Sequence, residues 1–227
     1  MSIVWTAKGC FERAAYSSEA DLEESILQVA PALFGASRHF LPVKRKIGGK
    51  TGPKNIPDGY LLDLAGPQPR LYVVEAELVA HDPLRHIAVQ ILEFSLSFEA
   101  GGRGVTAILM GAIQDRPDVF AECEKYAASH KYRNLDHMLN YLVFEAPFAA
   151  LVIIDELLDD LESVLTRSFQ FGVDVVELAR FTSKTGDRAY LFEPFLADVT
   201  DDVKPAEVGD VDTVVVHAQA DGFEETF

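Results

Sequence analysis

The stretch Ile56–Leu78, with the sequence IPDGYLLDLAGPQPRLYVVEAEL, predicts two adjacent strands and organises the rest of the chain around them. Tyr60–Leu62 and Leu71–Val74 are apolar runs typical of strands, and the segment Gly66–Pro69 between them has the composition of a turn. The apolar runs indicate that both strands are buried. We therefore expect a hairpin-like pair of strands at the centre of the fold.

Three carboxylates are placed unusually in this stretch. Asp58 stands at the start of the first strand, and Glu75 and Glu77 stand near the end of the second. Because strand side chains alternate between faces, Glu75 and Glu77 point to the same side as the apolar Leu71 and Val73. Carboxylates on an apolar face cost free energy unless a cation or hydrogen bonds compensate them, and Mg²⁺ is the simplest cation for oxygen ligands.

These residues resemble the PD-(D/E)xK nuclease superfamily, whose members have the restriction-endonuclease-like fold. Pro57-Asp58 matches the PD element, and Glu75-Ala76-Glu77 matches the (D/E)xK element except that Glu77 stands where most members have lysine. The chain therefore resembles the ExE variant of this motif. The resemblance implies an α/β fold with a mixed β-sheet core flanked by helices.

The resemblance also implies further site residues on two helices. Family members often place an extra carboxylate on the first helix, for which Glu23 is our first choice and Glu19 the second; a boundary residue reaching solvent is the alternative for either. Gln90 resembles the glutamine of the QxxxY element, with Phe94 in place of the tyrosine. His86 lies on the same predicted helix face, and a lone histidine there is more typical of a hydrogen-bonded structural residue than of a ligand.

If the resemblance holds, Asp58 and Glu75 bind Mg²⁺, with Mn²⁺ as a substitute, and the chain is a metal-dependent DNA endonuclease; RNA as a substrate stays open. Glu77 would accept a hydrogen bond from water, act as a general base or help to bind a second metal. Contacts to the nucleic-acid backbone would come from Lys44, Arg45 and Lys46. Cutting both strands would favour a homodimer, which the sequence does not establish.

The predicted order of elements is helix, three strands, helix, strand, which is the common core of the family. The resemblance covers about residues 19–113, residues 114–196 are an elaboration, and 1–196 form one nuclease-like domain. Residues 197–227 are predicted to be an acidic linker and a strand-like terminal segment, either the start of a truncated module or a swapped strand. The elements outside the central pair are a helix over Glu19–Phe34, a strand over Phe40–Ile47, a helix from Pro83 to Glu99 that stops at Gly101-Gly102, and a central strand over Gly104–Ile113.

Composition limits the function classes. The formal net charge is −16 over 227 residues, which lowers the expectation of a nucleic-acid partner. However, the segment 198–227 has nine acids and one base, a net charge of −8, so half of the negative charge lies there. By contrast, Arg38–Lys54 contains six bases and no acid, and such a local patch can contact phosphates; a solvated basic loop is the alternative.

Several other classes lack sequence support. The chain has no Gly-rich phosphate loop, nucleophile elbow, CxxC pair or HExxH motif. No apolar run approaches the length of a membrane span, and we expect no membrane partner. Cys10 and Cys123 predict reduced thiols and hence a cytoplasmic location.

Three hypotheses remain open from the sequence. The first is the metal-dependent endonuclease. The second is a nuclease-fold protein that has lost cleavage and serves as a nucleic-acid-binding or assembly module, which the glutamate at position 77 and the acidic balance would favour. The third is an acidic interaction protein whose carboxylates are structural or bind Ca²⁺.

Overall fold

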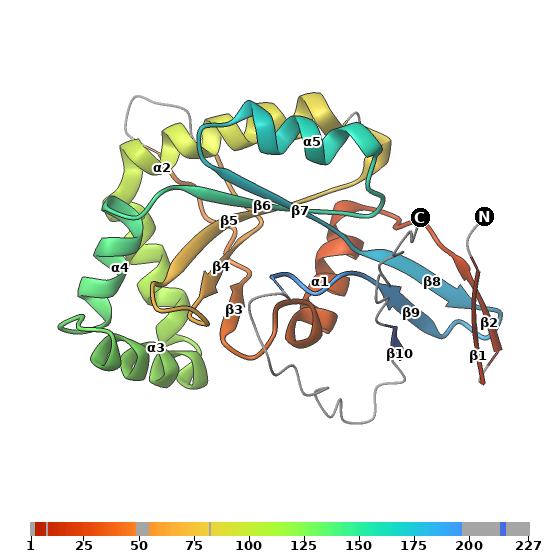
Figure 1. The fold of residues 1–227 in the computed structure, drawn as a ribbon, viewed down its shortest axis with the longest axis horizontal. Helices are drawn as coiled ribbons and strands as arrows, with labels where there is room; N and C mark the ends of the chain where they lie inside the picture. Colours follow the sequence, from red (N-terminus) through yellow and green to blue (C-terminus); the bar gives the residue numbers. More distant parts are fainter. Residues whose placement is uncertain (1–2, 8, 49–54, 82, 197–213, 217–227) are drawn as a thin grey trace, which may run out of the picture.

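The computed structural model describes residues 3–7, 9–48, 55–81, 83–196 and 214–216, and within them the chain is a mixed α/β protein (Figure 1). The described residues form five α-helices and two five-stranded sheets. The sheet that holds the central pair of strands is mixed, and we call it the large sheet. Its strands, in spatial order, are β3 (Arg38–Leu41), β4 (Gly59–Asp63), β5 (Arg70–Glu77), β6 (Ala149–Ile154) and β7 (Gly172–Glu177).

The predicted pair of strands is confirmed as β4 and β5 at the centre of the large sheet. β3, β4 and β5 pair antiparallel, whereas β5, β6 and β7 pair parallel. Every residue of β4 is buried, as is every residue of β5 after Arg70. Near-continuous apolar runs are expected where helices cover both faces of a sheet.

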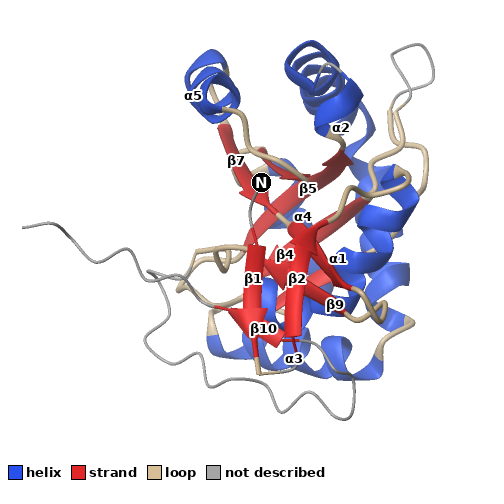
Figure 2. Cartoon of the chain, turned by 90° about the vertical axis from the view of Figure 1, so that its right-hand side faces the viewer, coloured by secondary structure: helices blue, strands red, loops and turns tan. Residues whose placement is uncertain are grey.

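Helices cover the two faces of the large sheet. α1 (Glu19–Phe34) packs Leu22, Ile26 and Val29 onto the face that carries Tyr72 and Val74. The opposite face is covered by the first half of α2 (Pro83–Gln114) and by α5 (Asp159–Ser168), which lie side by side in Figure 2. Glu75 and Glu77 lie on this opposite face, beneath α2, so their predicted common orientation is confirmed.

α2 is longer than predicted. The prediction of a strand over Gly104–Ile113 is wrong, because this segment is the second half of the helix. Its buried residues recur at helical spacing, since Phe98, Val105, Leu109 and Ile113 are seven, four and four positions apart. They pack against α3 (Pro117–Ser129) and α4 (Leu135–Phe144). Tertiary packing thus overrides the β-branched residues that suggested a strand.

The glycines expected to end this helix instead lie inside it. Gly102 packs against α4, where a Cβ atom would come within 2.5 Å of the Phe144 ring. At Gly101 a Cβ atom would come within 2.8 Å of the Gly48 backbone nitrogen. Both positions therefore allow a close approach of another segment, which costs some helix propensity but does not end the helix.

Two further boundaries differ from prediction. The strand expected over Phe40–Ile47 is β3, which ends at Leu41 directly before Pro42; the basic residues after it lie in a loop. The fourth strand of the core is not Gly104–Ile113 but β6, which follows the α2–α4 helices. From α1 onward the observed order is therefore one helix, three strands, three α-helices and a strand, and it ends at residue 154 rather than 113.

The second sheet, here called the small sheet, joins the two ends of the described chain. Its strands, in spatial order, are β1 (Ile3–Thr6), β2 (Gly9–Arg13), β8 (Ala179–Ser183), β9 (Arg188–Leu191) and β10 (Val214–Val216). Only Leu178 separates β7 from β8, so two strands that are almost continuous in the sequence belong to different sheets. β10 confirms a strand in the predicted strand-like segment, whereas the predicted acidic linker at 197–212 lies outside the described residues.

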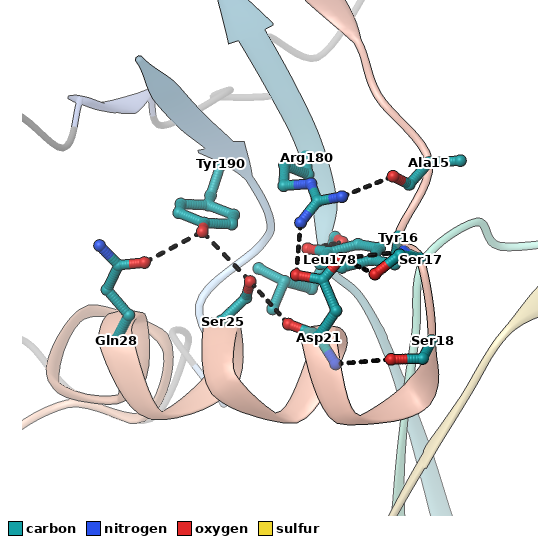
Figure 3. A network of polar contacts seen from close by, with 10 residues as sticks. All are labelled: Ala15, Tyr16, Ser17, Ser18, Asp21, Ser25, Gln28, Leu178, Arg180 and Tyr190. Atoms are coloured by element: carbon teal, nitrogen blue, oxygen red, sulfur yellow. Dashed lines mark hydrogen bonds and ion pairs between the residues drawn. The ribbon is translucent and has the colours of Figure 1, made fainter. Parts of the chain in front are cut away.

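A buried polar network fixes α1 against the small sheet (Figure 3). Arg180 Nη1 donates to Asp21 Oδ1 over 2.7 Å, and the Arg180 guanidinium stacks 4.3 Å from the Tyr16 ring centroid. Farther along α1, the Tyr190 hydroxyl bonds to Ser25 Oγ and donates to Gln28 Oε1. The Ser18 hydroxyl caps the helix by accepting a hydrogen bond from the Asp21 backbone N–H.

Candidate functional site

The site is built at the end of the antiparallel pair β4–β5. Gly59 pairs with Val74, which brings Asp58 to the neighbourhood of Glu75 on the adjacent strand. Asp58 Oδ2 accepts a hydrogen bond of 2.9 Å from the Ala76 backbone N–H, which fixes this carboxylate. Gly59 is needed here because a Cβ atom would lie 2.7 Å from the Leu41 carbonyl oxygen on β3.

Glu75 is a buried carboxyl group with an incomplete set of partners. Its residue exposure is 7%, and Oε1 accepts a hydrogen bond of 2.8 Å from Gln90 Nε2 on α2. Among the described residues, neither Glu75 Oε2 nor Gln90 Oε1 has a hydrogen-bond partner, although both atoms are buried. Buried polar atoms without partners are rare, and they point to a site that takes up another group.

The electrostatics of Glu75 agree with such a site. Burial, followed by the charges of Asp58, Glu77 and Glu19, raises the pKa of Glu75 from 4.5 to about 9. The hydrogen bond from Gln90 lowers this pKa but does not offset the other effects. Without an added cation, Glu75 is therefore protonated near neutral pH, and a bound cation would favour its ionised form.

Lys44 supplies a positive charge to the same place. Its Nζ lies 2.6 Å from Glu23 Oε1 and 3.1 Å from Asp58 Oδ1, so that it connects α1 to the start of β4. Partial burial lowers the pKa of Lys44, but its hydrogen bonds to Glu23 and Asp58 outweigh this effect and raise the pKa. The Lys44 side chain keeps 49% of its surface exposed.

Glu77 is buried more completely than Glu75. Its side chain is 1% exposed, and Oε1 accepts from the Leu78 backbone N–H over 3.0 Å. Oε2 lies 2.6 Å from Nδ1 of His86 on α2. The carboxylate that stands in the motif lysine position is therefore bound to a histidine, and that pairing was not predicted.

The structure brings together most of the predicted site residues. Asp58, Glu75, Glu77 and Gln90 lie around the end of β5, and Glu23 joins them through Lys44. Glu19, the second choice on α1, acts on Glu75 through its charge. Arg45 and Lys46 are exposed in the loop after β3, and of the three basic residues there Lys44 is the one that contacts the carboxylates.

Two residues acquire contacts that the sequence analysis did not predict. Lys44 was expected to contact nucleic acid rather than the carboxylates, and nothing in its spacing pointed to them. His86 was interpreted as structural, but its position four residues before Gln90 was a usable signal, because Glu75 and Glu77 are correspondingly two residues apart on the facing strand. Residues one helical turn apart on α2 therefore face residues two positions apart on β5, His86 facing Glu77 and Gln90 facing Glu75.

The donor atoms are compatible with Mg²⁺, although the described residues hold no group of three or more Asp, Glu, His or Cys side chains that could hold a metal ion. Mg²⁺ commonly uses one or two carboxylates and completes its shell with waters and phosphate oxygens. Asp58 and Glu75 are two such carboxylates, and Glu75 Oε2 is a buried oxygen that needs a partner. We conclude that these residues fit a hard divalent cation.

Comparisons with known proteins do not identify a family. No family model matches the chain, and neither a curated protein nor a solved structure does so. The helices described by the structure include none that is long and apolar enough to cross a membrane. A functional assignment therefore depends on the geometry and chemistry of the site.

Proposed function

We propose that this protein is a metal-dependent nuclease that hydrolyses phosphodiester bonds in DNA. The observation that carries this proposal is the placement of Asp58 at one end of β4–β5, where its charge acts on Glu75 and its Oδ1 lies 3.1 Å from the Lys44 ammonium. Two acids and a lysine are the chemical groups of the motif that the sequence resembles. Here the lysine comes from the loop after β3 and not from position 77.

The order of elements also supports the proposal. α1, β3, β4, β5, α2 and β6 follow the helix-strand-strand-strand-helix-strand order of the restriction-endonuclease-like fold, with α3 and α4 inserted before the last strand. In this arrangement β4 and β5 carry the carboxylates, and α2 covers them. We include the restriction-endonuclease-like fold in the proposal for this reason.

The chain's own residues can be assigned roles at a phosphodiester. Asp58 and Glu75 would hold Mg²⁺ or Mn²⁺, which when bound polarises the phosphate and lowers the pKa of a ligated water. Gln90 holds Glu75 Oε1 and leaves Oε2 for a ligand. The Lys44 ammonium can donate to phosphate oxygens and offset the negative charge that develops on them.

Exposed cations beside the site would contact the nucleic-acid backbone. Arg45 and Lys46 follow Lys44 in the same loop, and both are exposed. Contacts of this kind position a substrate without reading its sequence. They are compatible with DNA and with RNA, and a single-stranded substrate of each kind would separate the two.

The proposal is tested by cleavage of supercoiled plasmid and of single-stranded DNA and RNA, each with Mg²⁺, Mn²⁺ or EDTA. Wild type is compared with Glu75→Gln, which keeps the shape of the side chain but cannot ionise. Glu99→Gln is the matched control, because Glu99 is an exposed glutamate on α2. We expect metal-dependent cleavage that Glu75→Gln reduces by about 10²-fold or more and that Glu99→Gln leaves unchanged.

Absence of cleavage by folded wild-type protein under every condition would overturn the proposal. One observation would then favour a nuclease-fold binding or assembly module, namely that Glu77 occupies the lysine position and is bound to His86. Salt-sensitive binding of DNA without cleavage would support that second function.

A further inference from the structure

The pairing of Glu77 with His86 leads to an inference about proton transfer, which rests on the proposed nuclease function. We propose that His86 is the group that takes the proton from the attacking water, and that Glu77 is a positioning residue that acts through His86. Glu77 would then have no direct role toward water or metal, in contrast to the three roles that the sequence left open for it.

The first step of the argument is the arrangement of β5 and α2. Glu75 and Glu77 project from alternate positions of one strand, and Gln90 and His86 project from positions one helical turn apart. The two pairs form parallel contacts, Glu75 with Gln90 over 2.8 Å and Glu77 with His86 over 2.6 Å. His86 is therefore held about 6 Å along α2 from Gln90, the residue that holds Glu75.

The second step is the chemistry of the contact. A carboxylate oxygen accepts a hydrogen bond, so the ring nitrogen facing Glu77, which is Nδ1, carries the proton. In the neutral imidazole the lone pair is then on Nε2. Glu77 cannot turn away easily, because its side chain is 1% exposed and Oε1 is fixed by the Leu78 N–H. A buried carboxylate that fixes a histidine tautomer is the arrangement by which a general base is oriented.

The third step is access. His86 keeps 54% of its side-chain surface exposed although its partner is buried, so the rest of the ring is available to a substrate or a water. A histidine that served only to neutralise a buried carboxylate would not need this exposure. Gln90, which holds the other glutamate, has no proton-transfer chemistry of its own.

The reaction balances with water as the only co-reactant. His86 Nε2 takes a proton from water as the water oxygen forms a bond to phosphorus. The bond between phosphorus and the leaving oxygen breaks, and the electron pair goes to that oxygen, which takes up a proton from the imidazolium or from solvent. The products are a phosphomonoester and an alcohol, and His86 returns to its neutral form.

Cleavage kinetics test the proposal with three variants. We expect His86→Ala to lower kcat by about 10²–10⁴-fold with little change in KM, and added imidazole to restore a measurable part of that rate. Glu77→Gln should lower kcat less, because an amide oxygen still accepts from Nδ1, and imidazole should not rescue it. His137→Ala, a histidine on α4, is the control and should cut like wild type.

A second measurement does not depend on activity. The ¹⁵N shifts of the His86 ring, assigned by their loss in His86→Gln, should show the Nδ1-protonated tautomer in wild type and a mixture of tautomers in Glu77→Gln. Wild-type rates in His86→Ala, or a folded His86→Ala that imidazole does not rescue, would overturn the inference and leave the nuclease intact. A wild type that cuts nothing overturns the proposed function as well, and the tautomer then shows only whether Glu77 orients His86.

Discussion

At the scale of single residues, the buried carboxyl group of Glu75 lowers the free energy of unfolding of the protein. Glu75 is buried with one oxygen unpaired among the described residues, and its pKa is raised to about 9 by burial and by neighbouring carboxylates. A group with this environment is expected where function, not stability, determines the residue. The cost can be measured in the absence of metal.

Glu75→Gln should therefore stabilise the protein at pH 8 in EDTA. In the unfolded chain Glu75 ionises near pH 4.5, whereas in the folded chain it keeps its proton until about pH 9. Between these values the folded state binds more protons, so the contribution of Glu75 to the free energy of unfolding falls as pH rises. Glutamine does not titrate, so urea unfolding should show a gain over wild type that is small at pH 4.5 and larger at pH 8. A gain independent of pH would contradict the prediction.

Lys44 allows a prediction about activity. Lys44→Met should lower the cleavage rate by about 10²–10³-fold, because it removes the cation that contacts Asp58 and Glu23. Its effect on the free energy of unfolding should be below about 1 kcal/mol, since exposed ion pairs contribute little. Lys125→Met, at an exposed lysine of α3, is the control for both measurements.

At the scale of elements, α2 contains one glycine that its packing requires and another that it does not require. We expect Gly101→Ala to destabilise the protein by about 1–3 kcal/mol, because its Cβ would lie 2.8 Å from the Gly48 backbone. Gly104→Ala in the same helix should stabilise it by about 0.5–1 kcal/mol, because no atom lies within 4 Å of the added Cβ. Thermal unfolding of the two variants checks the pair, and equal effects would contradict the packing described for Gly101.

The Asp21–Arg180 pair predicts the acid stability of the contact between α1 and the small sheet. Burial raises the pKa of Asp21, but hydrogen bonds from Arg180 and Ser17 outweigh it and lower the pKa from 3.8 to about 2. The stabilisation is therefore complete above pH 4 and is lost as pH falls toward 2. Asp21→Asn should cost about 2 kcal/mol at pH 7 and progressively less below pH 4, as measured by urea unfolding. A constant difference over this range would show that the pair is not ionised.

Elements with a single clear local signal could be predicted from the sequence, whereas the second half of α2 could not. The helix α1 was predicted with its observed bounds, Glu19–Phe34, because a serine before a helix and a glycine after it are local signals. The second half of α2 carries β-branched residues after two glycines, and its helical form depends on α3 and α4. Such packing partners are not visible in a local window of sequence.

The residues of the candidate site also differ in whether the sequence alone could predict them. Asp58, Glu75, Glu77 and Gln90 could be predicted because each lies within two consecutive strands or the helix that follows them. The contacts of Lys44 depend on a loop folding back toward α1, and those of His86 depend on the register between α2 and β5. The loop that carries Lys44 has no fixed spacing relative to α1, whereas the four-residue spacing between His86 and Gln90 was a usable signal.

At the scale of the whole molecule, the charge distribution determines how a nucleic acid could be bound. The chain has a net charge of −16, yet the loop after β3 presents three consecutive cations. If this loop contacts phosphates, Lys46→Ala should reduce the slope of log affinity against log salt by about one. Lys184→Ala, in the exposed β8–β9 turn, should leave the slope unchanged. Equal slopes in wild type and Lys46→Ala would remove Lys46 from the interface.

The pairing of β2 with β8 has a consequence for synthesis of the chain. Glu12 lies opposite Thr182, a separation of 170 residues, and β1 in the same hairpin exposes Trp5 at 78% even in the finished structure. At about 5–20 residues per second, a ribosome needs about 10–30 seconds to reach β8 after the hairpin has been made. Throughout that interval the β2 edge of the hairpin has no partner strand. A chaperone or a second nascent chain could pair with this edge during the same interval.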